Sequence, residues 1–139
     1  MLSKQVNNTI IVRLDRGEEI LSSLKKVCED AQVRAGSIIG IGAVEGTTIG
    51  VYDLENGKYC DTELPQFMEL TNLTGNVSTM QGESYLHLHV TLADKSARTV
   101  GGHLKKAIVG ATAEIFITVY DAVIDRVRDD ATGLNLFSL

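Results

Sequence analysis

Three histidines carry the clearest chemical signal in the sequence. His87 and His89 lie in the alternating stretch Tyr85–Ala93, and His103 follows soon after, directly behind two glycines. Alternation is typical of a β-strand, so the first two imidazoles share one face, roughly 7 Å apart along the strand. Three neutral imidazoles can hold Zn²⁺ and leave one tetrahedral position open. If the strands around this connection pair, the sequence predicts a divalent metal site, with Zn²⁺ as the first candidate, at His87, His89 and His103.

An open coordination position suits a catalytic or sensing site, since metal-bound water becomes a nucleophile near neutral pH. No Asp or Glu stands beside the histidines in the sequence as a general base, although Glu69 and Glu114 could reach them from other strands. The alternative is a half-exposed polar strand face on which His103 merely hydrogen-bonds a turn. The sequence therefore leaves open whether the site is catalytic, and it does not identify a small-molecule ligand.

The composition of the 139-residue chain fits one domain, residues 1–139, with a mostly aliphatic core. Thirteen glycines against one proline indicate many tight turns and close strand contacts. No window reaches the ~18 apolar residues of a membrane span, and Met1–Gln5 lacks the apolar core of a signal peptide. We therefore expect a cytoplasmic protein without membrane contact, in which Cys28 and Cys60 stay reduced.

The charge of the chain argues against a dedicated nucleic-acid binder. The formal net charge is −5, whereas contacts to phosphates need clustered Lys and Arg. The candidate basic clusters are Lys25–Lys26, Lys105–Lys106 and Arg126 with Arg128, each of them short and flanked by acids. We interpret Lys105–Lys106 as solvated charge near a turn. DNA is thus expected to be a weak partner.

One amphipathic helix is predicted after a first strand at Thr9–Leu14. Asp15 followed by Glu18 forms a variant of the capping box. Apolar residues then recur at helical spacing, opposite a polar face. We expect the helix over Glu18–Ala31, with its end near Arg34–Gly36.

The glycine-rich stretch Gly36–Asp53 invites comparison with a dinucleotide-binding loop. Gly40 and Gly42 begin such a fingerprint, but Gly46 comes one residue late and β-branched strand material follows where a helix is required. We interpret the stretch as a pair of buried strands whose glycines allow bulges or close packing. Gly75–Asn76 is likewise interpreted as a bulge or turn, and not as a ligand site.

The rest of the chain is predicted to consist of strands joined by turns. Asn56-Gly57 indicates a type I′ hairpin, and Gln81-Gly82 a turn before the histidine strand. Further strands are expected over Phe67–Ser78 and Val109–Tyr120, with an edge strand or docking segment at Leu134–Leu139. The predicted fold class is α/β in the broad α+β sense, a mainly antiparallel β-sheet of about seven strands with one main helix packed on it.

Six short segments, taken in order, resemble the PPC domain, the plants-and-prokaryotes conserved domain. The likeness covers nearly the whole chain. The segments are Leu14–Glu18, Gly36–Ala43, Tyr52–Asp53, Glu69–Asn76, Leu86–Val90 and Gly101–Leu104. The resemblance implies a compact α/β domain that assembles into a homotrimer. It also implies that the three histidines are ligands of a bound divalent metal, as they look to be in the prokaryotic branch.

The same resemblance implies a regulatory or DNA-associated role. In plants the domain follows an AT-hook, an Arg-Gly-Arg-Pro segment that binds the minor groove of A·T-rich DNA. This sequence contains no such segment, and its only proline is Pro65. The plant segment that contacts partner proteins, Gly-Arg-Phe-Glu-Ile-Leu, falls on Gln66–Thr71, where only Glu69 and Leu70 keep its character. This sequence therefore contains no AT-hook segment and keeps only part of the segment that contacts partner proteins in plants.

Apolar strand surface supports the homotrimer independently. Segments such as Ile38–Val44 and Ile115–Tyr120 carry more apolar residues than one helix can cover. A closed cyclic trimer would bury this surface together with the open strand edges. The alternative is a monomer in which Leu134–Leu139 covers the open face.

Overall fold

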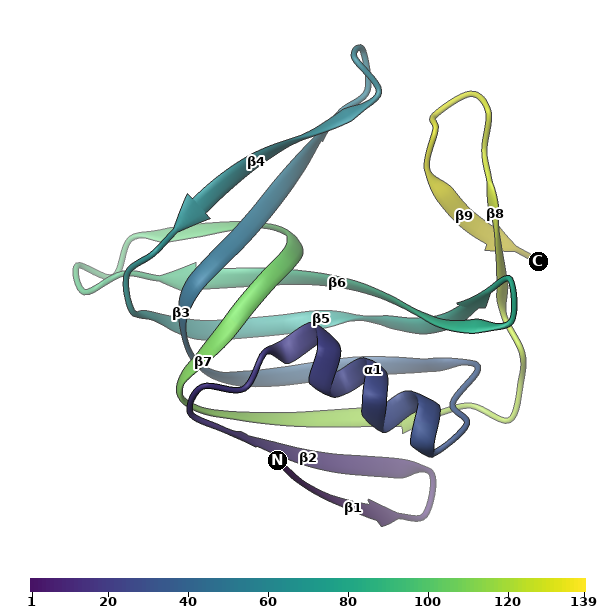
Figure 1. Cartoon of the computed structure of the whole chain (residues 1–139), viewed down its shortest axis with the longest axis horizontal. Helices are drawn as coiled ribbons and strands as arrows, with labels where there is room; N and C mark the ends of the chain where they lie inside the picture. The colour runs from purple at the N-terminus through teal and green to yellow at the C-terminus, as the bar shows by residue number, and fades with distance from the viewer.

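Nine strands form one sheet, and one helix packs on it (Figure 1). The computed structural model describes all residues, 1–139. The elements in chain order are β1 Leu2–Val6, β2 Thr9–Asp15, α1 Ile20–Asp30, β3 Gly36–Asp53, β4 Lys58–Leu64, β5 Met68–Met80, β6 Glu83–Ala93, β7 Thr99–Val119, β8 Asp125–Arg128 and β9 Asn135–Ser138. The predicted fold class is confirmed, with nine strands in place of about seven. No helix is long and apolar enough to cross a membrane.

Two long strands, β3 and β7, connect the parts of the sheet. Residues 36–44 of β3 lie between β5 and the end of β7, whereas residues 47–53 pair with β4 and with the start of β7. The end of β7 also pairs with β2, and its start with β6. Because β6 pairs with β5 as well, the strands β3, β5, β6 and β7 pair in a closed cycle. This cycle places β6 beside the start of β7. The strand that carries His87 and His89 therefore lies next to the segment that carries His103.

Helix α1 lies across one face of the sheet (Figure 1) and contributes its apolar side to a core of 24 buried residues. The helical residues in this core are Ile20, Leu24, Val27 and Cys28. Cys28 is buried and Cys60 exposed, and both are free thiols, as expected. Burial raises the pKa of the Cys28 thiol to about 12. Cys28 is therefore a packing residue and chemically quiet.

The predicted boundaries of the helix are wrong at both ends. The carboxylate of Glu19 caps it by accepting hydrogen bonds from the backbone N–H groups of the second and third helical residues. Glu18 instead accepts from the backbone N–H of Asp15 and from the N-terminal ammonium. Gly17, with φ of 90°, keeps the chain out of the helix until Glu19. The helix ends early because Gln32 adopts a left-handed φ of 53°.

The stretch Gly36–Asp53 forms one 18-residue strand, not the expected pair. It bends at register shifts on either side of Gly42 instead of turning back. The Asn56-Gly57 hairpin is present, but Leu54–Gly57 form a four-residue loop in which only Gly57 has a positive φ. The type I′ assignment is therefore wrong, since that turn requires positive φ at both central residues.

The C-terminal part of the chain contains a hairpin that the sequence pattern indicates only in part. The expected edge strand is β9, which pairs with the unpredicted strand β8. This hairpin joins the rest of the sheet through one parallel bridge, between Thr79 and Asp125. It stands beside the β3–β4 arm in Figure 1 and leaves Ile39 and Ile41 exposed. The tail therefore does not cover the open apolar face.

Candidate metal centre

Two neighbouring strands place the three histidines. In β6, Leu88, Val90 and Leu92 are buried, so His87 and His89 point together to the opposite face, as the alternation predicts. His103 belongs to β7, and its Cα is the direct cross-strand partner of His89. The alternative in which His103 merely hydrogen-bonds a turn does not hold, because His103 lies within β7, which begins at Thr99 and not at Val109.

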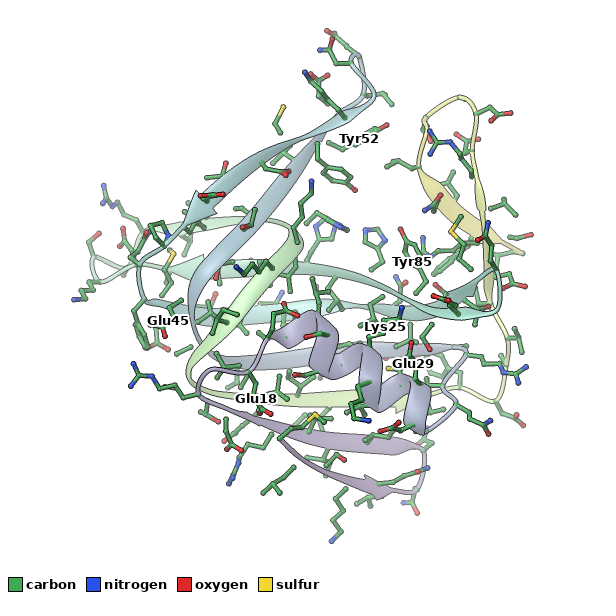
Figure 2. All side chains as sticks on the ribbon, in the orientation of Figure 1. Glu18, Lys25, Glu29, Glu45, Tyr52 and Tyr85 are labelled. Atoms are coloured by element: carbon green, nitrogen blue, oxygen red, sulfur yellow. The ribbon has the colours of Figure 1, made fainter.

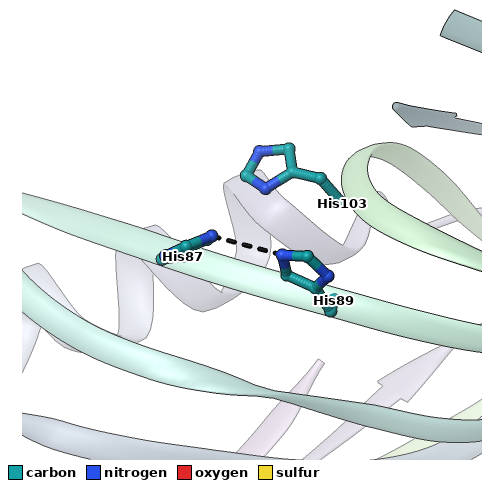
Figure 3. Close-up of side chains that lie close together, drawn as sticks. All are labelled: His87, His89 and His103. Atoms are coloured by element: carbon teal, nitrogen blue, oxygen red, sulfur yellow. Dashed lines mark hydrogen bonds between the residues drawn. The ribbon is translucent and has the colours of Figure 1, made fainter. Parts of the chain in front are cut away.

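The three imidazole rings face one another in a cluster (Figure 3). The Nε2 atoms of His87 and His89 are 3.3 Å apart, and the ring centroids of the three pairs are separated by 5.2, 5.2 and 5.4 Å. One nitrogen from each ring lies within 4.8 Å of the others. Zn²⁺ binds imidazole nitrogens at about 2.0–2.1 Å, so small side-chain rotations would suffice for these three residues to hold a metal ion.

Gly75 is the residue that lets β5 approach the histidine strand closely. It lies opposite Leu88, next to the Asn76–His87 pair. A Cβ at this position would collide with the carbonyl oxygen of His87, a backbone atom that cannot rotate away. The interpretation of Gly75–Asn76 as a bulge or turn is therefore wrong. The pair lies inside a continuous strand, where glycine is required by close backbone packing.

The protonation states of the cluster suit metal binding. Burial, with the neighbouring His87 and His89, lowers the pKa of His103 to about 4. Burial and then the positive charge of Arg126 lower the pKa of His87. The Nδ1 atom of His103 is buried and has no hydrogen-bond partner. Neutral imidazoles with an unused nitrogen are the form in which histidine binds a divalent cation.

The cluster opens into a pocket of about 560 Å³. One side of it comes from the β3–β4 arm, which contributes Tyr52 and Tyr59, and the other from the β8–β9 hairpin, which contributes Arg126 and Phe137. Figure 2 shows Tyr52 on the arm and Tyr85 on β6 near the hairpin. No Asp or Glu lines the pocket. The cavity therefore combines a wall of three histidines, which could bind a metal ion, with aromatic side chains from the arm and the hairpin.

Comparison with known proteins assigns this chain to a family. A family model described as the Plants and Prokaryotes Conserved (PCC) domain matches residues 1–121. The chain belongs to this family. The resemblance to the PPC domain is thereby confirmed, and the β8–β9 hairpin lies beyond the matched residues of the PCC domain.

Three solved structures share this PCC fold over nearly their whole length. A "putative DNA binding protein" from Bacteroides thetaiotaomicron is 33% identical, with a TM-score of 0.96 over 99% of this chain and 96% of that one. A plant- and prokaryote-conserved (PPC) protein from Pyrococcus horikoshii is 32% identical, with a TM-score of 0.88 over 99% and 94%. A metal-containing protein from Archaeoglobus fulgidus is 31% identical, with a TM-score of 0.88 over 100% and 99%.

Curated relatives are much longer proteins. The chain is 28% identical over 125 residues to a bifunctional protein GlmU from a Synechococcus strain, and it spans 18% of that protein's length. A second Synechococcus GlmU is 27% identical, with 19% of its length spanned. The likeness therefore concerns one segment of these proteins and does not carry over their activity.

Several residues in and around the histidine pocket differ from their sequence-based interpretation. Glu69 and Glu114 do not reach the histidines, because both line a separate pocket on another part of the sheet. Lys105 lies within β7 and pairs with Asp61 at 2.6 Å. Arg126 is only 7% exposed and contributes to the histidine pocket instead of a basic surface patch. Sequence reasoning missed its role because no local pattern links β8 to the histidine strand.

Proposed function

We propose that this PCC-domain protein binds one divalent metal ion, with zinc as the first candidate, through His87, His89 and His103. The observation that carries the proposal is the convergence of three imidazole nitrogens within 4.8 Å. Two adjacent strands of a closed cycle of pairings hold the ligands, so little ordering is needed on binding. The description of the Archaeoglobus relative as metal-containing supports the assignment.

Elemental analysis of protein purified without chelator tests this proposal. We expect close to one divalent ion per chain, and His89→Ala should lose it. Thr91→Ala is the matched control, because Thr91 lies two residues further along the same strand and outside the histidine cluster. Occupancy should fall as the pH drops below ~6, since protons compete for the imidazoles. Absence of metal even after incubation with Zn²⁺ would contradict the proposal.

The open coordination position supports ligand binding better than hydrolysis. A metal-dependent hydrolase needs an acid or base near the metal, and no Asp or Glu lines the pocket. Asp61, the carboxylate that acts electrostatically on His103, is already paired with Lys105. We therefore favour a site that binds a small molecule at or beside the metal, with a metal-dependent enzyme as the alternative.

We further propose that the protein is a homotrimer in which an exposed apolar patch is buried. The patch consists of Ile39, Ile41, Phe116 and Ile11. Ile39 and Ile11 are both cross-strand partners of Phe116, so the side chains form a row over β2, β7 and β3. Ile39, Ile41 and Phe116 are 59%, 60% and 44% exposed. Such a contiguous patch is typical of an interaction surface.

Light scattering after size exclusion tests the assembly. We expect a mass of three chains at low micromolar concentration, and Ile39→Glu should reduce it to one. Leu54→Glu is the matched control, because Leu54 is 63% exposed but lies in the loop after β3. A wild-type mass near one chain would overturn the trimer.

A DNA-associated regulatory role is the second candidate function, favoured by the description of the Bacteroides relative. The charges oppose strong binding, since the net charge is −5 and many basic side chains are paired with acids. We therefore expect weak affinity for duplex DNA at ~150 mM salt and a shallow salt dependence. Fluorescence anisotropy with A·T-rich and mixed duplexes checks this, and sub-micromolar, sequence-dependent binding would make DNA a true partner.

A further inference from the structure

The wall of the histidine pocket contains a buried arginine without an acidic partner. Arg126 donates hydrogen bonds from Nε to Ser78 Oγ at 2.8 Å, from Nη1 to the carbonyl oxygen of Asn135 at 2.6 Å, and from Nη2 to Asn76 Oδ1 at 2.8 Å. All three acceptors are neutral. Since a guanidinium carries five N–H groups, two remain, one on each terminal nitrogen. The charge of Arg126 is thus held in place but not neutralised.

Two aromatic rings pack against the guanidinium. Its central carbon lies 4.8 Å from the ring centroid of Tyr85 and 4.4 Å from that of Phe137. Stacked in this way, the group is pre-organised, because little side-chain freedom is left to lose when a ligand binds. Burial lowers the pKa of Arg126, but arginine stays protonated in proteins. Arg126 therefore presents a permanent positive charge to the pocket that it lines.

The rest of the pocket contains nothing that would balance this charge. Its lining includes no Asp or Glu, and Asp125, next to Arg126 in β8, bonds to Thr79 instead. A divalent ion in the proposed metal site would add two more positive charges to the same cavity. The remaining walls are aromatic or aliphatic, with Tyr52, Tyr59, Val51 and Leu136 among the lining residues. A cavity of about 560 Å³ is in the range of small-molecule sites.

We propose that this pocket binds a small organic carboxylate, with Arg126 as the residue that recognises the carboxylate group and the aromatic walls in contact with the apolar body. A carboxylate has two oxygens for the two remaining N–H groups, and such paired bonds to arginine are short and strong. The proposal deepens the proposed metal function, since the metal adds attraction for the same anion. It does not require the metal, because Arg126 is charged in its absence.

Calorimetric titration with 3-phenylpropionate as the probe tests this inference, on zinc-loaded and on chelator-treated protein. We expect binding in both forms, tighter with zinc. The neutral amide of the probe should bind at least about tenfold more weakly, because it lacks the charge. The assignment would be overturned if the amide bound as tightly as 3-phenylpropionate. It would also be overturned if phenyl phosphate bound and 3-phenylpropionate did not.

Asn76→Asp is the decisive variant, because it preserves the acceptor for Arg126 while adding a negative charge beside it. We expect it to weaken probe binding at least about tenfold, as a neutralised guanidinium no longer attracts an anion. Asn8→Asp adds the same charge at an exposed turn and should leave binding unchanged. Arg126→Gln should abolish binding, and circular dichroism shows whether it still folds.

The outcomes separate this inference from the metal proposal. Zinc at one ion per chain without any probe binding overturns the carboxylate site and leaves the metal site standing. Probe binding that depends on Arg126 in a protein that takes up no zinc supports the carboxylate site and contradicts the metal proposal. Unchanged probe affinity in Asn76→Asp overturns the role of Arg126 in either case.

Discussion

The histidine pocket has two walls of different construction. The wall with the histidines comes from β5, β6 and β7, and β6 pairs with β5 over Glu83–Ala93 and with β7 over His89–Ala93, within a closed cycle of strands. The wall with Arg126 is the β8–β9 hairpin, which joins the sheet through one bridge between Thr79 and Asp125. Side-chain contacts also hold the hairpin, among them those of Arg126, the hydrogen bond between Thr79 and Asp125, and the hydrogen bond from the Tyr52 hydroxyl to the carbonyl oxygen of Thr132 at 2.6 Å.

This difference separates the two proposed functions of the pocket physically. A continuous ladder of backbone hydrogen bonds fixes the positions of metal ligands within fractions of an ångström, which a tetrahedral ion requires. A hairpin attached by side chains opens at lower free energy than the sheet, because few buried contacts oppose its motion. The proposed metal site thus lies on the rigid wall, whereas the guanidinium of Arg126, although fixed by its own contacts, belongs to the more adaptable wall.

The largest effect is expected from Gly75→Ala, which attacks the rigid wall. The added Cβ would collide with the His87 carbonyl oxygen, and relief requires β5 and β6 to separate at the metal ligands. We expect a loss of about 3 kcal/mol in the free energy of unfolding, at the upper end of the usual cost of overpacking. Chemical denaturation of the metal-free protein measures it, and elemental analysis should show a parallel loss of metal.

Gly110→Ala is the matched control for this prediction. Its added Cβ would lie 2.9 Å from a ring carbon of Phe67, which is a partly exposed side chain that can rotate. We therefore expect a smaller loss of stability and unchanged metal content. Equal losses in the two variants would show that the approach of β5 to β6 is not specially tight.

The rigid wall could be predicted from sequence and the adaptable wall could not. Strict alternation assigns His87 and His89 to one face of a strand, and the period of two admits no other arrangement. Gly101–Gly102 indicate a close approach near His103, although the start of β7 at Thr99 is hidden by the weak strand propensity of that segment. These local signals suffice because cross-strand pairing then brings His103 to His89.

Arg126 depends on long-range contacts that leave no periodic signal. Its partner Asn76 is 50 residues away in sequence, and β8 has only four residues, too few to show a period. The same applies to Gly17 and Gln32, whose left-handed backbone shortens the helix. One cue was available, because an arginine between apolar residues such as Ile124 and Val127 is a candidate for a stacked, half-buried position.

An intermediate effect is expected from acidification of the metal-free protein. The pKa of His103 is about 4 in the folded state, below its ordinary value of 6.5, so between these values the unfolded chain binds the proton and the folded chain does not. The free energy of unfolding should therefore fall as the pH drops from 6.5 toward 4, and be insensitive to His103 above 6.5. Allowing for solvent screening, we expect about 1 kcal/mol by pH 5.

The measurement is urea denaturation across this pH range. It compares the chelator-treated wild type with its His103→Gln variant. The variant should lose less stability on acidification than the wild type, because glutamine does not titrate. Parallel pH profiles would mean that the imidazole of His103 is better solvated than its burial in the rigid wall implies.

The smallest effect is expected from Tyr52→Phe, which loosens only the adaptable wall. The substitution removes the hydrogen bond to Thr132, and water can replace it, so the free energy of unfolding should change by at most about 1 kcal/mol. Amide hydrogen exchange should nevertheless become faster in Asp129 and Gly133, whose N–H groups bond within the hairpin, while amides of β6 stay protected.

Tyr59→Phe is the control, because Tyr59 lines the same pocket but its hydroxyl makes no hydrogen bond. If β6 and the hairpin exchange at equally increased rates in Tyr52→Phe, the two walls open as one unit, and the carboxylate and the metal would then be bound by a single rigid site.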